Sequence, residues 1–159
     1  MPFSLDKVGV DLTANDTTAN AQFKVGTVTK LSDGGEAIYV RALSTIAAFD
    51  AVGIDAAGAA FPLTTTKSAT TKKVGFAQSA ITSAYFGWVQ TSGIVKVNLA
   101  ANCDDNVPLY TTATGGVLDD TVVSGGLILG VTSTVTISNA TAVTCIAATG
   151  AMVGTGDMD

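Results

Sequence analysis

The sequence predicts a compact all-β domain with a barrel-like body, and three observations support this. Gly, Asp, Asn, Ser and Pro recur at turn spacing, roughly every 8–12 residues, as in barrels and sandwiches of short strands. The segments between them are rich in Val, Ile, Ala and Thr and alternate between apolar and polar or small residues. No stretch shows the longer apolar period of an amphipathic helix. With 159 residues, the chain is long enough for one domain with a real core.

The first 22 residues are expected to form an extended N-terminal arm. Val8, Val10 and Leu12 alternate with Gly9 and Asp11, which indicates a short strand with one apolar face. The polar run DLTANDTTANAQ that overlaps it cannot build a core of its own. We interpret the segment as an arm that orders on another surface by adding to a sheet edge, with an ordinary terminus as the alternative. The residues assigned to this docking role are Phe3, Leu5, Val8, Val10 and Leu12.

The body is expected to span residues 23–150 and to open with a hairpin. Residues 23–31 alternate as a half-buried strand, and Ser32-Asp33-Gly34-Gly35 is a strong turn signal because Gly adopts positive φ without penalty. Residues 35–43 return as the second strand. The Ala-rich segment 44–51 fits either a helical turn or an extended chain.

Further strands are expected in the middle of the body. AVGID forms a short strand, followed by a turn that leads to Pro62. The polar run TTTKSATTKK contains Lys67, Lys72 and Lys73 and reads as a solvated loop. KVGFAQSAI is the next strand, in which Gly75 could mark a bulge.

The stretch Tyr85–Val97, YFGWVQTSGIVKV, is predicted to be the central hairpin, with Thr91-Ser92-Gly93 as its turn. Trp88 is the only tryptophan of an aromatic-poor chain, and we expect it to anchor the core. The alternative is that Trp88 and its aromatic neighbours form a platform for a sugar or a partner.

The C-terminal third is expected to add strands between two turn clusters. Val107–Thr111 is a short strand, and Pro108 places it at a sheet edge or at its own start. Strands are also expected within VVSGGLILGVTSTVTIS and in TAVTCIAA. Residues 151–159 are expected to be a flexible tail.

The composition of the chain favours some classes of function over others. Charged residues make up 13% of the chain, about half of the usual share. The exterior must therefore be covered by Thr, Ser, Ala and Gly, which favours packing against other proteins. The eight Lys and Arg residues form no basic patch in a chain of net charge −5, which argues against nucleic-acid binding.

The sequence offers no recognisable catalytic constellation. Histidine is absent, which removes the commonest general base and metal ligand, and no nucleotide-binding or nucleophile motif occurs. We therefore expect neither an enzyme nor a cofactor or small-molecule substrate. Asp104-Asp105 and Asp119-Asp120 are expected to cap turns, with Ca²⁺ ligation as the alternative. Cys103 and Cys145 are expected to be buried free thiols, with a disulfide as the alternative.

The sequence is not expected to carry a targeting signal or a membrane span. The opening MPFSLDKVGV is not the pattern of a signal peptide, and no apolar run approaches the length of a membrane span. The sequence thus predicts an intracellular origin and no membrane partner.

After the polar arm the chain presents, in order, FKVGTVTKLSDGGEAIYVRA, AVGIDAAGAAFPL, VGFAQSAI, YFGWVQTSGIVKV and VPLYTTATGGVLDD. This order resembles the small β-rich decoration (cement) proteins of tailed-bacteriophage heads and related phage structural proteins, over about residues 23–150. Its most specific parts are the aromatic-Gly-Trp-Val-Gln run ending in Gly93, and Pro108-Leu109 followed by Thr114-Gly115-Gly116.

The resemblance implies a β-barrel or "tulip" body that assembles as a homotrimer on the outer capsid surface. Such a protein binds the major capsid protein, bridges its subunits and stabilises the shell, so that it resides in the virion after synthesis in the host cytoplasm. Two other functions stay open. One is a β-rich module that binds a host surface or glycan through Tyr85, Phe86 or Tyr110, and the other is a self-assembling shell or tail subunit.

Overall fold

The computed structural model describes residues 10–154, apart from the side chains of residues 149–151. Within that part the chain is all-β, as the sequence predicted, with one short 3-10 helix at Ser68–Thr70. The strands are β1 (Asn15–Asp16), β2 (Val28–Lys30), β3 (Glu36–Ala42), β4 (Ala51–Ile54), β5 (Ala59–Pro62), β6 (Lys73–Phe76), β7 (Phe86–Leu99), β8 (Pro108–Thr111), β9 (Leu118–Asp119), β10 (Leu127–Ser133) and β11 (Thr141–Val153).

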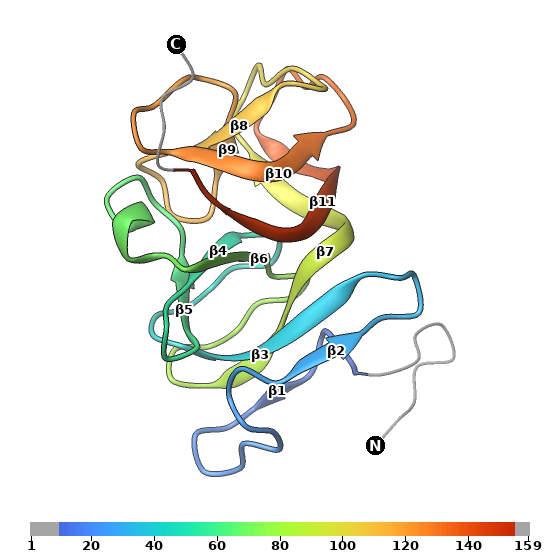
Figure 1. The fold of residues 1–159 in the computed structure, drawn as a ribbon, viewed down its shortest axis with the longest axis vertical. Coiled ribbons are helices and arrows are strands. Elements are labelled where there is room, and N and C mark those ends of the chain that lie inside the picture. Colours follow the sequence, from blue (N-terminus) through green and yellow to red (C-terminus); the bar gives the residue numbers. More distant parts are fainter. Residues whose placement is uncertain (1–9, 155–159) are drawn as a thin grey trace.

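The strand pairings close two five-stranded rings that share β7, and so confirm a barrel-like body. One ring runs β7–β6–β4–β5–β3 and returns to β7. The other runs β7–β11–β10–β8–β9 and returns to β7. In Figure 1 the long β7 passes from the lower half of the molecule, beside β3, to the upper half, beside β11.

The prediction of a hairpin at residues 85–97 is wrong, because this segment belongs to one continuous strand, β7. Its first half pairs with β3, from Phe86 opposite Arg41 to Ser92 opposite Glu36. Its second half pairs with β11, from Gly93 opposite Ala147 to Leu99 opposite Thr141. Gly93 has a φ of +97°, and the register with β3 shifts nearby, so the glycine bends the strand toward a new partner and does not reverse it.

The first expected hairpin is confirmed. β2 and β3 pair antiparallel, and the turn is closed by the Leu31 N–H, which donates to the Gly35 carbonyl oxygen at 2.8 Å. The expected alternation also holds along residues 23–31. The odd-numbered residues are half-buried, or buried in the case of Leu31, and the even-numbered residues are exposed.

The segments after the hairpin differ in part from the expectation. β4 is confirmed, but Ala59–Pro62, expected as a turn, forms β5 between β3 and β4. The ambiguous segment 44–50 is not helical, and Ile46 bridges to Ile81. Gly75 lies in regular register with β4 and marks no bulge there. A Cβ on Gly75 would lie 2.9 Å from Val89 Cγ2, so close packing explains the glycine.

Buried side chains form three clusters. Two of them are built largely from inward-facing residues of the two rings. The third comprises Leu12, Leu31, Ala37, Tyr39 and Trp88, with Val10, Phe23 and Phe86 packed against it. Trp88 is only 5% exposed, which confirms it as a core anchor. Because Val89 belongs to a ring cluster, Trp88 faces away from that ring and is covered by the N-terminal segment.

The N-terminal segment from Val10 onward packs on the body. β1 pairs with β7, with Asn15 opposite Gly87, and the Tyr39 hydroxyl donates a hydrogen bond to the Asp16 carboxylate. At the other end, β11 continues to Val153, beyond the boundary expected at residue 150. The Gly154 N–H then donates to the Leu127 carbonyl oxygen at 2.7 Å. Residues 1–9 and 155–159 lie outside the described part.

Candidate functional site

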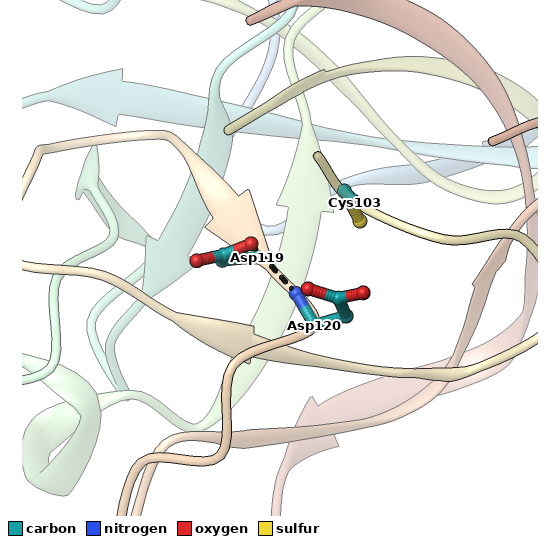
Figure 2. Close-up of side chains that lie close together, drawn as sticks. All are labelled: Cys103, Asp119 and Asp120. Carbon is teal, nitrogen blue, oxygen red and sulfur yellow. Dashed lines mark hydrogen bonds between the residues drawn. The ribbon is translucent and has the colours of Figure 1, made fainter. Parts of the chain in front are cut away.

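A cluster of one thiol and two carboxylates is the strongest concentration of metal-ligand atoms among the described residues. Cys103 comes from the loop after β7, whereas Asp119 and Asp120 come from the end of β9 and the residue that follows it (Figure 2). Their ligand atoms all lie within 4.8 Å of one another. Cys103 is fully buried, and the two aspartates are half-buried.

Both carboxylates already accept main-chain hydrogen bonds. The Asp120 N–H donates to Asp119 Oδ1 at 2.9 Å, the dashed line in Figure 2. The Asp104 N–H donates to Asp120 Oδ2 at 2.9 Å, so that Asp120 ties the two acidic turns together. These contacts confirm the expected capping role of Asp119 and Asp120.

The thiol of Cys103 is a poor nucleophile and a poor ligand in this setting. Burial raises its pKa to about 11, and the negative charges of Asp120 and Asp119 act in the same direction. The thiolate is the form that attacks electrophiles and binds metals, so at neutral pH the group is almost entirely in its inert form. The cluster is accounted for as a hydrogen-bonded junction between loops.

The second acidic pair is also engaged locally. The Thr136 hydroxyl donates to Asp105 Oδ1 at 3.0 Å, and the Asn106 side-chain amide donates to Asp105 Oδ2 at 2.8 Å. Cys145 is a buried free thiol like Cys103, as expected, and burial raises its pKa to about 12.

The five residues assigned to docking do not share one environment. Phe3, Leu5 and Val8 lie outside the described residues. Val10 is half-buried against the Trp88 cluster, and Leu12 is 6% exposed within it. The side chain of Leu12 therefore stabilises its own chain and offers almost no surface to a partner.

The proposed aromatic platform does not form as a surface. Trp88 and Tyr110 are each 5% exposed. The Tyr39 ring stacks on Phe86 with centroids 5.9 Å apart, and Tyr39 also lies 5.2 Å from Trp88. Phe86, Tyr39 and Trp88 pack in or against the cluster that contains Leu12, whereas Tyr85 packs against the other side of β7. The aromatic neighbours of Trp88 are therefore divided between two clusters and do not form one plate.

Two surface features escaped the sequence analysis. The outer face of β7, β10 and β11 exposes Ile94, Leu129, Ile146 and Met152. Beside it, a groove of about 280 Å³ opens where β10 bulges away from β8, lined mainly by Pro108, Leu127, Leu129 and Val131. The signal in the sequence was a pair of adjacent apolar residues, such as Ile94-Val95 and Cys145-Ile146, which places an apolar side chain on each face of the strand.

The solvated loop expected for Lys67, Lys72 and Lys73 holds for two of them. Lys67 and Lys72 are exposed, whereas Lys73 is half-buried as the first residue of β6. The Lys67 ammonium lies 5.3 Å from the centroid of the Phe61 ring. No helix in the part of the chain that the structure covers is long and apolar enough to cross a membrane.

Comparison with known proteins gives no relative: no family model, curated protein or solved structure matches this chain.

Proposed function

We propose that this chain is a structural virion protein that decorates the outer surface of a tailed-bacteriophage head and stabilises the shell. The class of protein, a phage-head decoration protein, is inferred from the sequence resemblance. The observation that supports the proposal on the structural side is an all-β body whose β7–β11–β10 sheet exposes Ile94, Ile146, Leu129 and Met152 on its outer face. Neighbouring exposed apolar side chains of this kind suit contact with another protein.

The proposed mechanism is stabilisation by mass action. A protein that binds only the assembled shell shifts the equilibrium away from disassembly. The proposed partners are the major capsid protein and other copies of this chain, as a homotrimer. Many modest contacts repeated around a symmetric shell would add up through avidity.

The N-terminal docking segment is proposed to be residues 2–9, with Phe3, Leu5 and Val8 as its apolar contacts. A deletion reaching residue 20 would also remove Leu12 and β1, and it would damage the body through the Trp88 cluster. Deletion of residues 2–9 removes the three proposed apolar contacts and keeps every residue from Val10 onward, including Leu12 and β1.

The test is binding to shells that lack this protein. Wild-type protein should co-sediment with expanded shells and raise the temperature at which they disassemble. The variant without residues 2–9 should lose binding while it keeps the circular dichroism spectrum and the melting temperature of the wild type. Wild-type protein that leaves shells unoccupied would overturn the proposed function, and undiminished decoration by the deletion variant would overturn the role of the segment.

The other two functions make different predictions. A glycan-binding module would need open aromatic rings, but Tyr110 and Trp88 are each 5% exposed, and Tyr85 and Phe86 are half-buried. A self-assembling shell or tail subunit would form large particles alone, which sedimentation of the purified protein distinguishes from a small oligomer.

A further inference from the structure

The groove between β8 and β10 opens because the two strands lose their register there. Ile128 of β10 lies opposite Leu109, whereas the next paired residue of β10, Thr132, lies opposite Pro108. The three residues between them, 129–131, therefore have no Cα partner on β8, and this stretch of the β10 edge is open. Pro108 has no N–H, so it cannot donate a main-chain hydrogen bond across the gap.

The size and lining of the groove suit the side chains of a partner. Its volume of about 280 Å³ lies just below the roughly 300–1,000 Å³ of typical small-molecule sites. Leu127, Leu129 and Val131 make its wall on β10 apolar, and Leu129 is 46% exposed. None of the described residues that line the groove is charged. The groove thus has room for one or two apolar side chains and holds no group that would pair with a charge inside it.

Acidic turns border the groove at Asn106, one of its lining residues. The Asn106 side-chain amide donates to Asp105 Oδ2 at 2.8 Å. The Asp104 N–H donates to Asp120 Oδ2 at 2.9 Å, which brings the turn after β9 to the same place. Asp104 is exposed, and Asp105 and Asp120 are half-buried. Both donors are neutral, so these hydrogen bonds leave the negative charge of the carboxylates in place.

The second half of the chain has no cation to balance that charge. Residues 97–159 contain six aspartates but no Lys or Arg, because all eight Lys and Arg residues lie between Lys7 and Lys96. The ion pair found among the described residues joins Lys30 and Glu36, on β2 and β3, away from this ring. An acidic region of this kind attracts a positively charged partner and repels an acidic one.

We infer that the groove binds an extended segment of a partner protein in which Lys or Arg lies within two residues of a bulky apolar side chain. The apolar side chain fills the groove, and the basic side chain pairs with Asp105 or Asp104 at its end. The segment lies along the open edge of β10, as a strand added to a sheet. The inference goes beyond the proposed function, because it concerns a groove of the free chain and requires no shell.

The experiment is selection of a displayed library of random short peptides on the immobilised full chain, without shells. The recovered peptides should be enriched, relative to the unselected library, in Lys or Arg close to a bulky apolar residue. They should also bind the protein in solution. Their affinity should fall as the ionic strength rises above about 0.1 M, because the ion pair is exposed to solvent.

Two matched pairs of variants locate the binding site. Leu129→Ala, in the groove, should lower the affinity about fivefold. Ile94→Ala should leave it unchanged, because Ile94 is exposed on the outer face of the sheet but does not line the groove. Asp105→Asn should lower the affinity about two- to fivefold, the range of an exposed ion pair. Asp55→Asn should leave it unchanged.

Asp55 is a close match for Asp105. Both are half-buried turn aspartates whose carboxylates accept two hydrogen bonds each, but Asp55 follows β4 in the other ring. Selection that recovers no peptide above the bare support, or recovers peptides without basic residues, would overturn the inference. Equal affinities within either pair of variants, with circular dichroism spectra like that of the wild type, would overturn it as well. Because no measurement includes shells, failure of this groove and failure of the proposed function are read from separate experiments.

Discussion

The side-chain amide of Gln90 reaches across the bend at Gly93 and donates a hydrogen bond to the Ile94 carbonyl oxygen at 3.2 Å. The same Nε2 atom donates to the Ser92 carbonyl oxygen at 2.9 Å. Gln90 is 1% exposed, so these carbonyl groups are paired where water has little access. Since β7 belongs to both rings, this side chain stabilises the point at which the strand passes from one ring to the other.

Replacing Gln90 by Met keeps most of the side-chain volume but removes both hydrogen bonds. The Ser92 and Ile94 carbonyl groups then lose a partner, and the free energy of unfolding should fall by about 1–3 kcal/mol. Chemical denaturation measures the change. Gln78→Met is the control: the Gln78 amide also donates to two carbonyl oxygens, at 3.3 Å each, but it is only half-buried. Equal losses in the two variants would contradict a special role for Gln90.

The bend of β7 approaches Gly35 so closely that no side chain fits at this position. A Cβ on Gly35 would lie 2.4 Å from the Ser92 carbonyl oxygen, a main-chain atom that cannot move without disturbing β7. Gly35→Ala should therefore lower the free energy of unfolding by about 3 kcal/mol. The neighbouring Gly34 has a φ of +84° but open space around it, so Gly34→Ala should cost only about 1 kcal/mol, through its backbone conformation. A larger loss in Gly34→Ala, measured by the same denaturation, would refute the steric explanation.

Local patterns predicted the strands well and their connections less well. The first hairpin followed from Ser32-Asp33-Gly34-Gly35, and burial of Trp88 followed from its apolar neighbours. The glycine at 93 looked equally like a turn, because positive φ occurs both in tight turns and in bulges that bend a strand. Which one forms depends on whether a distant strand pairs with the following residues, and here β11 does.

The surface was less predictable than the fold for the same reason. Leu12 looked like part of an arm because its polar neighbours could not form a core locally. Its partners, Leu31, Tyr39 and Trp88, are distant in sequence. The exposure of Ile94 and Ile146 likewise depends on which strands lie beside them and on what covers the sheet, information that alternation along one strand does not contain.

The stability of the protein should carry a pH dependence that originates at Asp50. Burial raises the pKa of this carboxyl above its ordinary value of 3.8, although the Ala47 N–H and the Asn98 amide oppose the shift by hydrogen bonding to it. The folded state then binds the proton more tightly than the unfolded state. The contribution of Asp50 to stability is therefore fully present below pH 3.8 and is lost as pH rises through the folded-state pKa.

Asp50→Asn isolates this contribution, because the other carboxyl groups titrate in both proteins. The unfolding free energy of the wild type minus that of the variant should be largest at the acidic end and should fall as pH rises toward neutral. Denaturation curves at matched pH values provide the difference. A difference that grows as pH rises would mean that the hydrogen bonds outweigh burial and that the folded-state pKa is lowered.

The two cysteines should be unreactive in the folded protein. With pKa values of about 11 and 12, Cys103 and Cys145 are ionised at pH 8 to no more than about one part in a thousand. A thiol-specific disulfide reagent should therefore react slowly with native protein and rapidly with two thiols after unfolding in guanidinium. Rapid reaction of one thiol in the native state would show that Cys103 is more accessible and more acidic than its burial implies.

Leu12→Ala tests whether the segment from Val10 to Gln22 belongs to the body or to a separate arm. Leu12 is 6% exposed and packs in the cluster that contains Tyr39 and Trp88, so truncation should leave a cavity and lower the free energy of unfolding by about 2–4 kcal/mol. Leu43→Ala is the control, because Leu43 is 54% exposed and its truncation should change stability by no more than about 0.5 kcal/mol. If Leu12→Ala were as mild as the control, the segment would contribute little to folding. Residues 10–22 would then return to the docking arm, and the deletion that tests shell binding would have to extend past them.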